Sequence, residues 1–88
     1  MNTDELILLC AVRYALGRRS YMVSTVAEHV ALNLGKLSKY CVDFIIRDIE
    51  EEIEFYHRSG HTCGDACDER VWLNLLEKLK SEPEVTNV

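Results

Sequence analysis

The sequence predicts an all-α protein, a compact bundle of about four helices, and three observations favour this fold class. Apolar residues recur at i, i+3 and i+4 spacing in four segments, which glycine and serine turns separate. The 88 residues include one proline and four glycines, too few for a loop-rich or all-β design. Hydrophobic residues make up 48% of the chain, a proportion typical of a packed globule rather than of a disordered segment.

The first expected helix runs from about Thr3 to Leu16, with Asn2 or Thr3 as its cap and Gly17 just past its end. It is apolar almost all round, and a helix of this kind is buried on most sides. So short a chain can hardly cover it alone, which predicts at least a homodimer. We expect Leu8→Glu or Val12→Glu to break the oligomer or the fold.

The second expected helix starts at a Ser20 cap and ends at Gly35. Its apolar face comprises Val23, Val26, Ala27, Val30, Ala31 and Leu34.

The third helix, the longest, starts at Ser38, and a turn over 60–64 separates it from a last helix capped by Asp65 or Asp68. The apolar face of the third helix comprises Val42, Ile45, Ile46, Ile49, Ile53 and Tyr56. That of the last comprises Val71, Trp72, Leu75, Leu76 and Leu79. We therefore expect one helical domain over 1–82 and a flexible tail over 83–88.

Hydropathy, cysteine content and net charge limit where the protein is expected in the cell and what it is expected to bind. No run reaches the roughly 18 apolar residues of a membrane span, and no basic leader precedes Leu6. We expect a cytoplasmic protein that does not bind a membrane, in which the four cysteines are mainly thiols. The net charge of −5 argues against generic nucleic-acid binding, which needs a basic excess.

Charge is unevenly distributed. Five basic residues stand against one acidic residue over 13–39, and six acidic against one basic over 43–54. The simpler interpretation is that the two zones complement each other within the subunit, with Arg13 paired to an acid of the third helix. Alternatively, the basic zone faces a phosphate-bearing or acidic partner, or the acidic helix face binds a protein target.

Two histidines and two cysteines gather before the last helix, at His57, His61, Cys63 and Cys67. These are zinc-ligand types, but the spacing is not that of a standard finger or ribbon. A disulfide between Cys63 and Cys67, or a nucleophilic cysteine, are further alternatives. The simplest interpretation is a helix-capping turn in which Cys67 packs inward and the histidines are solvated.

The stretch RYALGRRSY carries the candidate ligand site, around a junction between two helices. Arginine contacts phosphate, tyrosine offers a flat face to a base, and the start of a helix favours an anion. Trp72 would add a second stacking face. The predicted ligand-binding residues are Tyr14, Arg18, Arg19, Tyr21 and Trp72.

These residues also carry a resemblance. The chain resembles a pattern in small accessory proteins of tailed bacteriophages, L-G-R-x-[ST]-Y followed by G-D-x-C-D-x-x-x-W. The matching positions are Leu16, Gly17, Arg18, Ser20 and Tyr21, then Gly64, Asp65, Cys67, Asp68 and Trp72. His57, His61 and Cys63 are not part of that pattern, which favours the capping turn over a metal site.

The resemblance implies a function in countering host immunity. Small phage accessory proteins are often anti-defence factors, and two kinds are similar in size and character. One sequesters a nucleotide immune signal, with arginines and aromatics at subunit junctions. The other is anti-CRISPR-like and inhibits a host defence protein through an acidic face. We expect the first, a non-enzymatic homo-oligomer without a cofactor that binds a small anionic nucleotide in the host cytoplasm, with a zinc-stabilised structural module as a further alternative.

Overall fold

Four α-helices and one short 3-10 helix make up the part of the chain that the computed structural model describes, residues 2–17 and 21–81. No strand occurs within these ranges, so the predicted all-helical class is confirmed for them. In chain order the elements are α1 (Thr3–Ala15), α2 (Tyr21–Leu32), η1 (Leu34–Lys36), α3 (Lys39–Arg58) and α4 (Ala66–Ser81).

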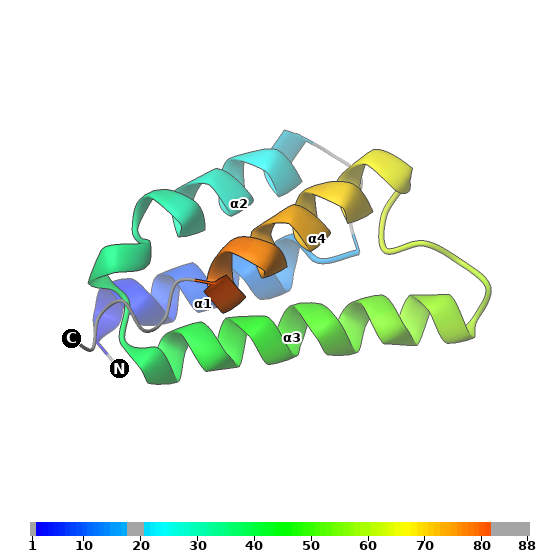
Figure 1. The fold of residues 1–88 in the computed structure, drawn as a ribbon. Helices are drawn as coiled ribbons and strands as arrows, with labels where there is room; N and C mark the ends of the chain where they lie inside the picture. Colours follow the sequence, from blue (N-terminus) through cyan, green and yellow to red (C-terminus); the bar gives the residue numbers. More distant parts are fainter. Residues whose placement is uncertain (1, 18–20, 82–88) are drawn as a thin grey trace.

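The helices form a four-membered ring around one core. α1 packs against α2 and α3, and α4 packs against the same two helices, so α1 and α4 face each other across the bundle. Figure 1 shows α4 in front, α1 behind it, and the long α3 running beneath both. The ends of α1 and α3 and the starts of α2 and α4 lie at one end of the bundle, where the candidate site was predicted.

Local capping signals determine where three of the helices begin. The Asn2 side chain accepts the N–H of Glu5, and the Glu5 carboxylate accepts the N–H of Asn2, which forms a complete capping box. Ser38 Oγ accepts the N–H of Cys41 at the start of α3. Asp65 accepts the N–H groups of Cys67 and Asp68 at the start of α4. These caps agree with the predicted starts.

Gly35 does not terminate the second helix as predicted. α2 ends at Leu32, and Gly35 lies inside η1 with Leu34. The Asn33 side chain donates to the carbonyl of His29 at 2.8 Å and so satisfies one of the last carbonyls of α2. A tighter 3-10 turn then carries the chain toward Ser38.

The core consists of the predicted inward faces together with two cysteines that the apolar pattern did not include. Cys41 and Cys63 are fully buried among the apolar side chains. The remaining buried apolar residues are Leu9, Val12, Ala15, Leu16, Val23, Val26, Ala27, Val30, Ile45, Ile49, Ile53, Trp72, Leu75, Leu76 and Leu79.

Leu8 and Val12 of α1, where we expect glutamate to break the oligomer or the fold, both face this core. Val12 is fully buried and Leu8 packs against the core, because α2 and α3 cover that side of α1. The outer side of α1 is still apolar, with Leu6 55%, Ile7 62% and Tyr14 54% exposed. Substituting Val12 would therefore damage the fold of one subunit, and the exposed apolar surface lies on different residues.

Candidate ligand-binding site

The α1–α2 junction turns on Gly17, which has a φ of +83°. Residues with a Cβ rarely adopt this left-handed conformation, so the glycine is required by the backbone itself. A Cβ there would also lie 2.6 Å from the Tyr56 hydroxyl oxygen of α3. The junction therefore sits close against the end of α3, with no room for a side chain at this position.

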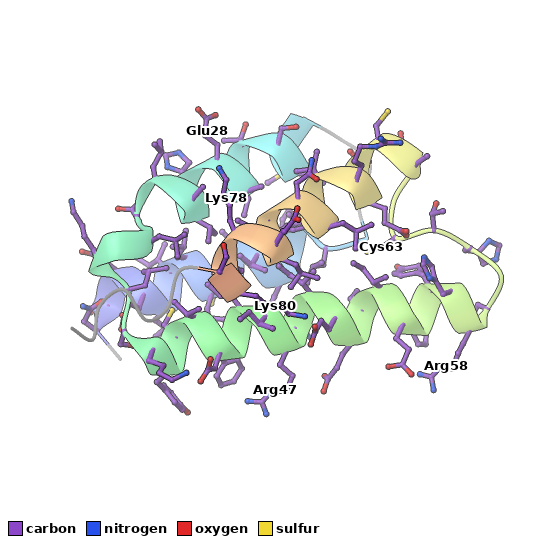
Figure 2. The ribbon with its side chains drawn as sticks, viewed as in Figure 1. Glu28, Arg47, Arg58, Cys63, Lys78 and Lys80 are labelled. Atoms are coloured by element: carbon purple, nitrogen blue, oxygen red, sulfur yellow. The ribbon has the colours of Figure 1, made fainter. Side chains whose placement is uncertain are left out.

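A second contact ties the junction to the α3–α4 connection. The backbone N–H of Gly17 points to the Cys63 thiol, which is fully buried. Burial raises the pKa of this thiol and outweighs the lowering effect of the Gly17 N–H. Figure 2 shows Cys63 on the inner side of the connection, facing the helices. The thiol serves as packing at this end of the bundle and not as a reactive group.

Of the predicted ligand-binding residues, Tyr14 lies at the surface in the last turn of α1. Tyr21 is the first residue of α2, and its side chain falls outside the described part of the structure. Arg18 and Arg19 also lie outside the described residues. The structure therefore places Tyr14 and the start of α2 on the two sides of one short junction.

Trp72 cannot be a stacking face, which corrects the prediction. Its side chain is 0% exposed and lies in the core of the bundle. The reason is its register on α4, because it shares the inward face with Leu75, Leu76 and Leu79. Its indole nitrogen makes no hydrogen bond within the described part of the chain, so the ring is held by packing alone.

The helix starts differ in charge, and this difference distinguishes α2. α1 has Asp4 and Glu5 in its first turn, and α4 has Asp68 and Glu69. α3 has no acid of its own there, but Glu5 Oε2 accepts the N–H of Ser38 at 2.6 Å. The first turn of α2 contains no acidic residue. Within the described ranges, α2 and α3 thus have no acidic residue of their own in the first turn, and at α3 Glu5 supplies a carboxylate from α1.

Glu5 is a structural residue that the sequence reasoning did not single out. It is buried, yet it joins the α1 cap to the start of α3, 33 residues away. The N–H of Ser38, and to a lesser degree that of Asn2, hold the pKa of this carboxyl below its ordinary value in spite of burial. The spacing of Asn2 and Glu5 is a recognisable capping-box signal, whereas the bond to Ser38 has no local signature.

Arg13 is occupied inside the subunit, as the simpler interpretation of the charge zones predicted. Its guanidinium lies 3.5 Å from the buried carboxylate of Asp48 on α3. Burial raises the pKa of Asp48, and Arg13 acts in the opposite direction. Arg13 therefore connects α1 to α3 through Asp48.

The outer surface of α3 is mixed in charge rather than uniformly acidic. Asp43 pairs with Lys39, and Glu50 pairs with Lys80 of α4. Figure 2 shows Arg47 and Arg58 pointing away from the bundle along the same helix. Three of the six acidic residues of the run are thus paired with cations, Asp43, Asp48 and Glu50, whereas no ion pair within the described residues involves Glu51, Glu52 or Glu54.

The histidine–cysteine set does not converge on one point. His57 Nε2 lies 2.9 Å from Glu69 Oε2, and Glu69 Oε1 accepts the N–H of Cys63 at 2.8 Å. Burial acts to raise the pKa of Glu69, but these two contacts outweigh it, so the pKa is lowered. Within 2–17 and 21–81, no group of three or more His, Cys, Asp or Glu residues is arranged to hold a metal ion.

The two cysteines of this set are placed opposite to the prediction. Cys63 is buried and Cys67 is exposed on the first turn of α4. Cys67 lies two residues after the Asp65 cap, and α4 turns its other face toward the core. The connection brings Cys63 inward instead, beneath the α1–α2 junction.

An open groove of about 730 Å³ runs between α3 and α4. Ile53 and Leu76 form its apolar floor, Leu73 borders it, and ionic side chains line its rims. The rim residues are Glu50, Glu54, His57, Arg58 and Lys80. Because acidic and basic groups alternate there, the groove favours no ligand of one charge.

Comparison with protein-family models, curated proteins and solved structures finds no match to this chain. None of the described helices is long and apolar enough to cross a membrane.

Proposed function

We propose that this chain is a non-enzymatic anti-defence protein of the phage type, which binds and sequesters an anionic nucleotide signal at the α1–α2 junction. On this proposal it acts as a homo-oligomer in the cytoplasm of the host cell and needs no cofactor. The resemblance to phage accessory proteins supplies the biological setting, and the junction supplies the chemistry.

The observation that carries the proposal is the start of α2. The first turns of the other three helices each face a carboxylate, whereas that of α2 contains no acidic residue. Backbone N–H groups at such a helix start attract a phosphate through the helix dipole. In the sequence, Arg18 and Arg19 lie three and two residues before the first residue of this helix, and guanidinium groups add bidentate contacts to phosphate.

The base of the nucleotide would stack on tyrosine. Tyr14 is 54% exposed in the turn before the junction, and Tyr21 opens the helix after it. Stacking on an aromatic ring contributes about 1–3 kcal/mol per base. Trp72 takes no part, because its ring is fully buried. The proposed site therefore consists of Tyr14, Arg18, Arg19, Tyr21 and the start of α2.

Calorimetry against cyclic dinucleotides, cyclic trinucleotides and ADP-ribose derivatives tests this proposal. We expect one of these compounds to bind with a dissociation constant on the order of 10 µM or tighter. Arg18→Ala should remove binding, and Tyr14→Ala or Tyr21→Ala should cost about 1–3 kcal/mol of affinity.

Arg58→Ala is the matched control, because Arg58 points outward from α3 away from the junction (Figure 2). It should bind like the unmodified protein. The proposal fails if no compound in the panel binds, or if Arg58→Ala reduces affinity as much as Arg18→Ala does. Thermal melting of each variant distinguishes lost binding from lost folding. If Arg18→Ala greatly lowered the melting temperature, Arg18 would be a structural residue.

A further inference from the structure

Glu69 of α4 joins three parts of the chain at the end of the bundle where the candidate ligand site lies. Its carboxylate lies against the His57 imidazole, with Nε2 3.0 Å from Oε1 and 2.9 Å from Oε2. Oε1 also accepts the backbone N–H of Cys63 at 2.8 Å. His57 lies in the last turn of α3, and Cys63 lies in the connection between α3 and α4. One side chain therefore fixes α4 both to the end of α3 and to the connection.

The α3–α4 connection has few other hydrogen bonds to the helices. The N–H of His61 bonds to the carbonyl of Tyr56 at 2.9 Å, close to the end of α3. Among the described residues, the bond from Cys63 to Glu69 is the one hydrogen bond that joins residues 62–64 to a helix. Without the Glu69 carboxylate, packing alone would hold the middle of the connection to the helices.

The α1–α2 junction rests on the parts of the chain that Glu69 holds. The Gly17 N–H points to the Cys63 thiol, which is fully buried. A Cβ at Gly17 would also lie 2.6 Å from the hydroxyl oxygen of Tyr56, the residue before His57. Gly17 therefore lies close to both the connection and the end of α3. Two sets of contacts lead from Glu69 to the junction, one through Cys63 and one through the end of α3.

We infer that Glu69 is a positioning residue for the α1–α2 junction. It holds the α3–α4 connection against the bundle, and the connection and the end of α3 together hold Gly17. The Glu69 side chain is 12% exposed, so little water competes for its contacts, and hydrogen bonds to a charged acceptor are stronger than those to a neutral one. When these contacts are lost, this end of the bundle opens locally while the rest of the bundle stays folded.

The opposite end of the bundle has a similar arrangement and provides a comparison within the same molecule (Figure 1). There Glu5 of α1 accepts the N–H of Ser38 at 2.6 Å, and Cys41 is a fully buried thiol in the first turn of α3. Each end thus has a carboxylate that binds the backbone of another segment, and each has a buried thiol. Because a thiol must be accessible to be alkylated, the two buried thiols report which end opens.

Alkylation of the two buried thiols tests the inference without any nucleotide. In the folded protein, Glu69→Ala should raise the alkylation rate of Cys63 on the order of tenfold and leave that of Cys41 unchanged, as read by peptide mass mapping. Glu5→Ala is the matched control and should accelerate Cys41 more than Cys63. Equal acceleration of both thiols in Glu69→Ala would mean that the whole fold is destabilised, and an unchanged Cys63 rate would mean that Glu69 does not hold the connection. Either result overturns the inference.

Glu69→Gln distinguishes the hydrogen bond from the charge. Burial raises the pKa of the Cys63 thiol, and the Glu69 carboxylate raises it further, so removal of this charge by itself increases the reactive thiolate. Glu69→Gln removes the same charge as Glu69→Ala but keeps an acceptor for the Cys63 N–H. It should therefore leave Cys63 protected. Equal acceleration in the two variants would assign the effect to ionisation of the thiol and contradict the positioning role.

This inference deepens the proposed function and rests on it in one respect, the ligand site at the junction. A ligand that binds the closed junction lowers the population of the open form. The cyclic nucleotide or ADP-ribose derivative that binds in calorimetry should therefore slow the alkylation of Cys63 in Glu69→Ala and leave that of Cys41 unchanged. A bound nucleotide without effect on Cys63 would contradict the link between the junction and the connection. If no compound binds, the proposed function fails, and the thiol rates measured without nucleotide still decide the role of Glu69.

Discussion

Four cysteine thiols occupy two distinct environments in this small protein. Cys41 and Cys63 are fully buried in the core, whereas Cys10 and Cys67 are exposed on helices α1 and α4. Burial raises the pKa of both core thiols, and for Cys41 the nearby Glu5 carboxylate raises it further. Since the thiolate is the reactive form, the core thiols are protected by both access and protonation.

The thiols should therefore react in two classes. In dilute folded protein we expect an alkylating reagent to modify Cys10 and Cys67 rapidly and to leave Cys41 and Cys63 unmodified, as read by peptide mass mapping. All four should react in denaturant, which serves as the control. Rapid modification of Cys63 in the folded protein would show that the connection beneath Gly17 opens readily.

At the scale of elements, α1 and α3 are joined by a hydrogen bond and an ion pair, each of which involves a buried carboxylate. Glu5 reaches the start of α3 through Ser38, and Arg13 reaches the middle of α3 through Asp48. Together they hold both ends of α1 against the same helix. The second link has a cost, because Asp48 is buried and its Oδ2 atom has no hydrogen-bond partner among the described residues.

The Arg13–Asp48 pair should respond asymmetrically to mutation. Arg13→Ala leaves a buried carboxylate without its cation and should lower the free energy of unfolding by about 1–3 kcal/mol. Asp48→Asn removes the buried charge and should change stability by less than about 1 kcal/mol. Urea denaturation at neutral pH measures both. Equal losses in the two variants would mean that the ion pair itself stabilises the fold.

At the scale of the whole molecule, the bundle is one ring of four helices whose stability depends on several buried or half-buried carboxylates. The pKa values of Glu5 and Glu69 are lowered in the fold, and that of Asp48 is raised. Glu5 connects α1 to the start of α3, 33 residues away, and Glu69 connects α4 to Cys63 of the preceding connection, 6 residues away. Protonation of these two carboxylates therefore weakens the contacts between elements more than it weakens any single helix.

Stability should fall as the pH drops below about 4, where glutamate in the unfolded chain takes up protons. A lowered folded pKa contributes stability that is present above the unfolded pKa and lost as pH falls through the folded value. Asp48 has the opposite effect on the pH dependence of stability, since a group with a raised pKa in the fold lowers stability as pH rises through the same region. Thermal melting from pH 3 to 7 should show that the melting temperature falls on acidification. The fall should be smaller in the Glu5→Gln variant and larger in the Asp48→Asn variant. If the melting temperature of the Glu5→Gln variant fell with acidification as much as that of the unmodified protein, Glu5 would not be a source of the acid sensitivity.

The sequence by itself determined the helical class, the inward faces and most helix starts. Caps such as Asn2, Ser38 and Asp65 act within three residues, and the apolar spacing of a helix face repeats every few residues. Gly17 was predictable for the same reason, because the end of a helix needs a left-handed residue. These features depend on near neighbours in the chain, which a sequence displays directly.

Only the tertiary structure decided which of these residues are available to a ligand. The fold removed Trp72 from the candidate site, buried Cys63 and exposed Cys67 where the opposite was expected for Cys67, and linked Glu5 to Ser38 across 33 residues. Each outcome depends on which helices pack against each other. The same residue type is buried at one position and exposed at another because of that packing. Periodicity identifies the face of a helix, but only the arrangement of all four helices shows that Leu6 and Ile7 of α1 remain exposed.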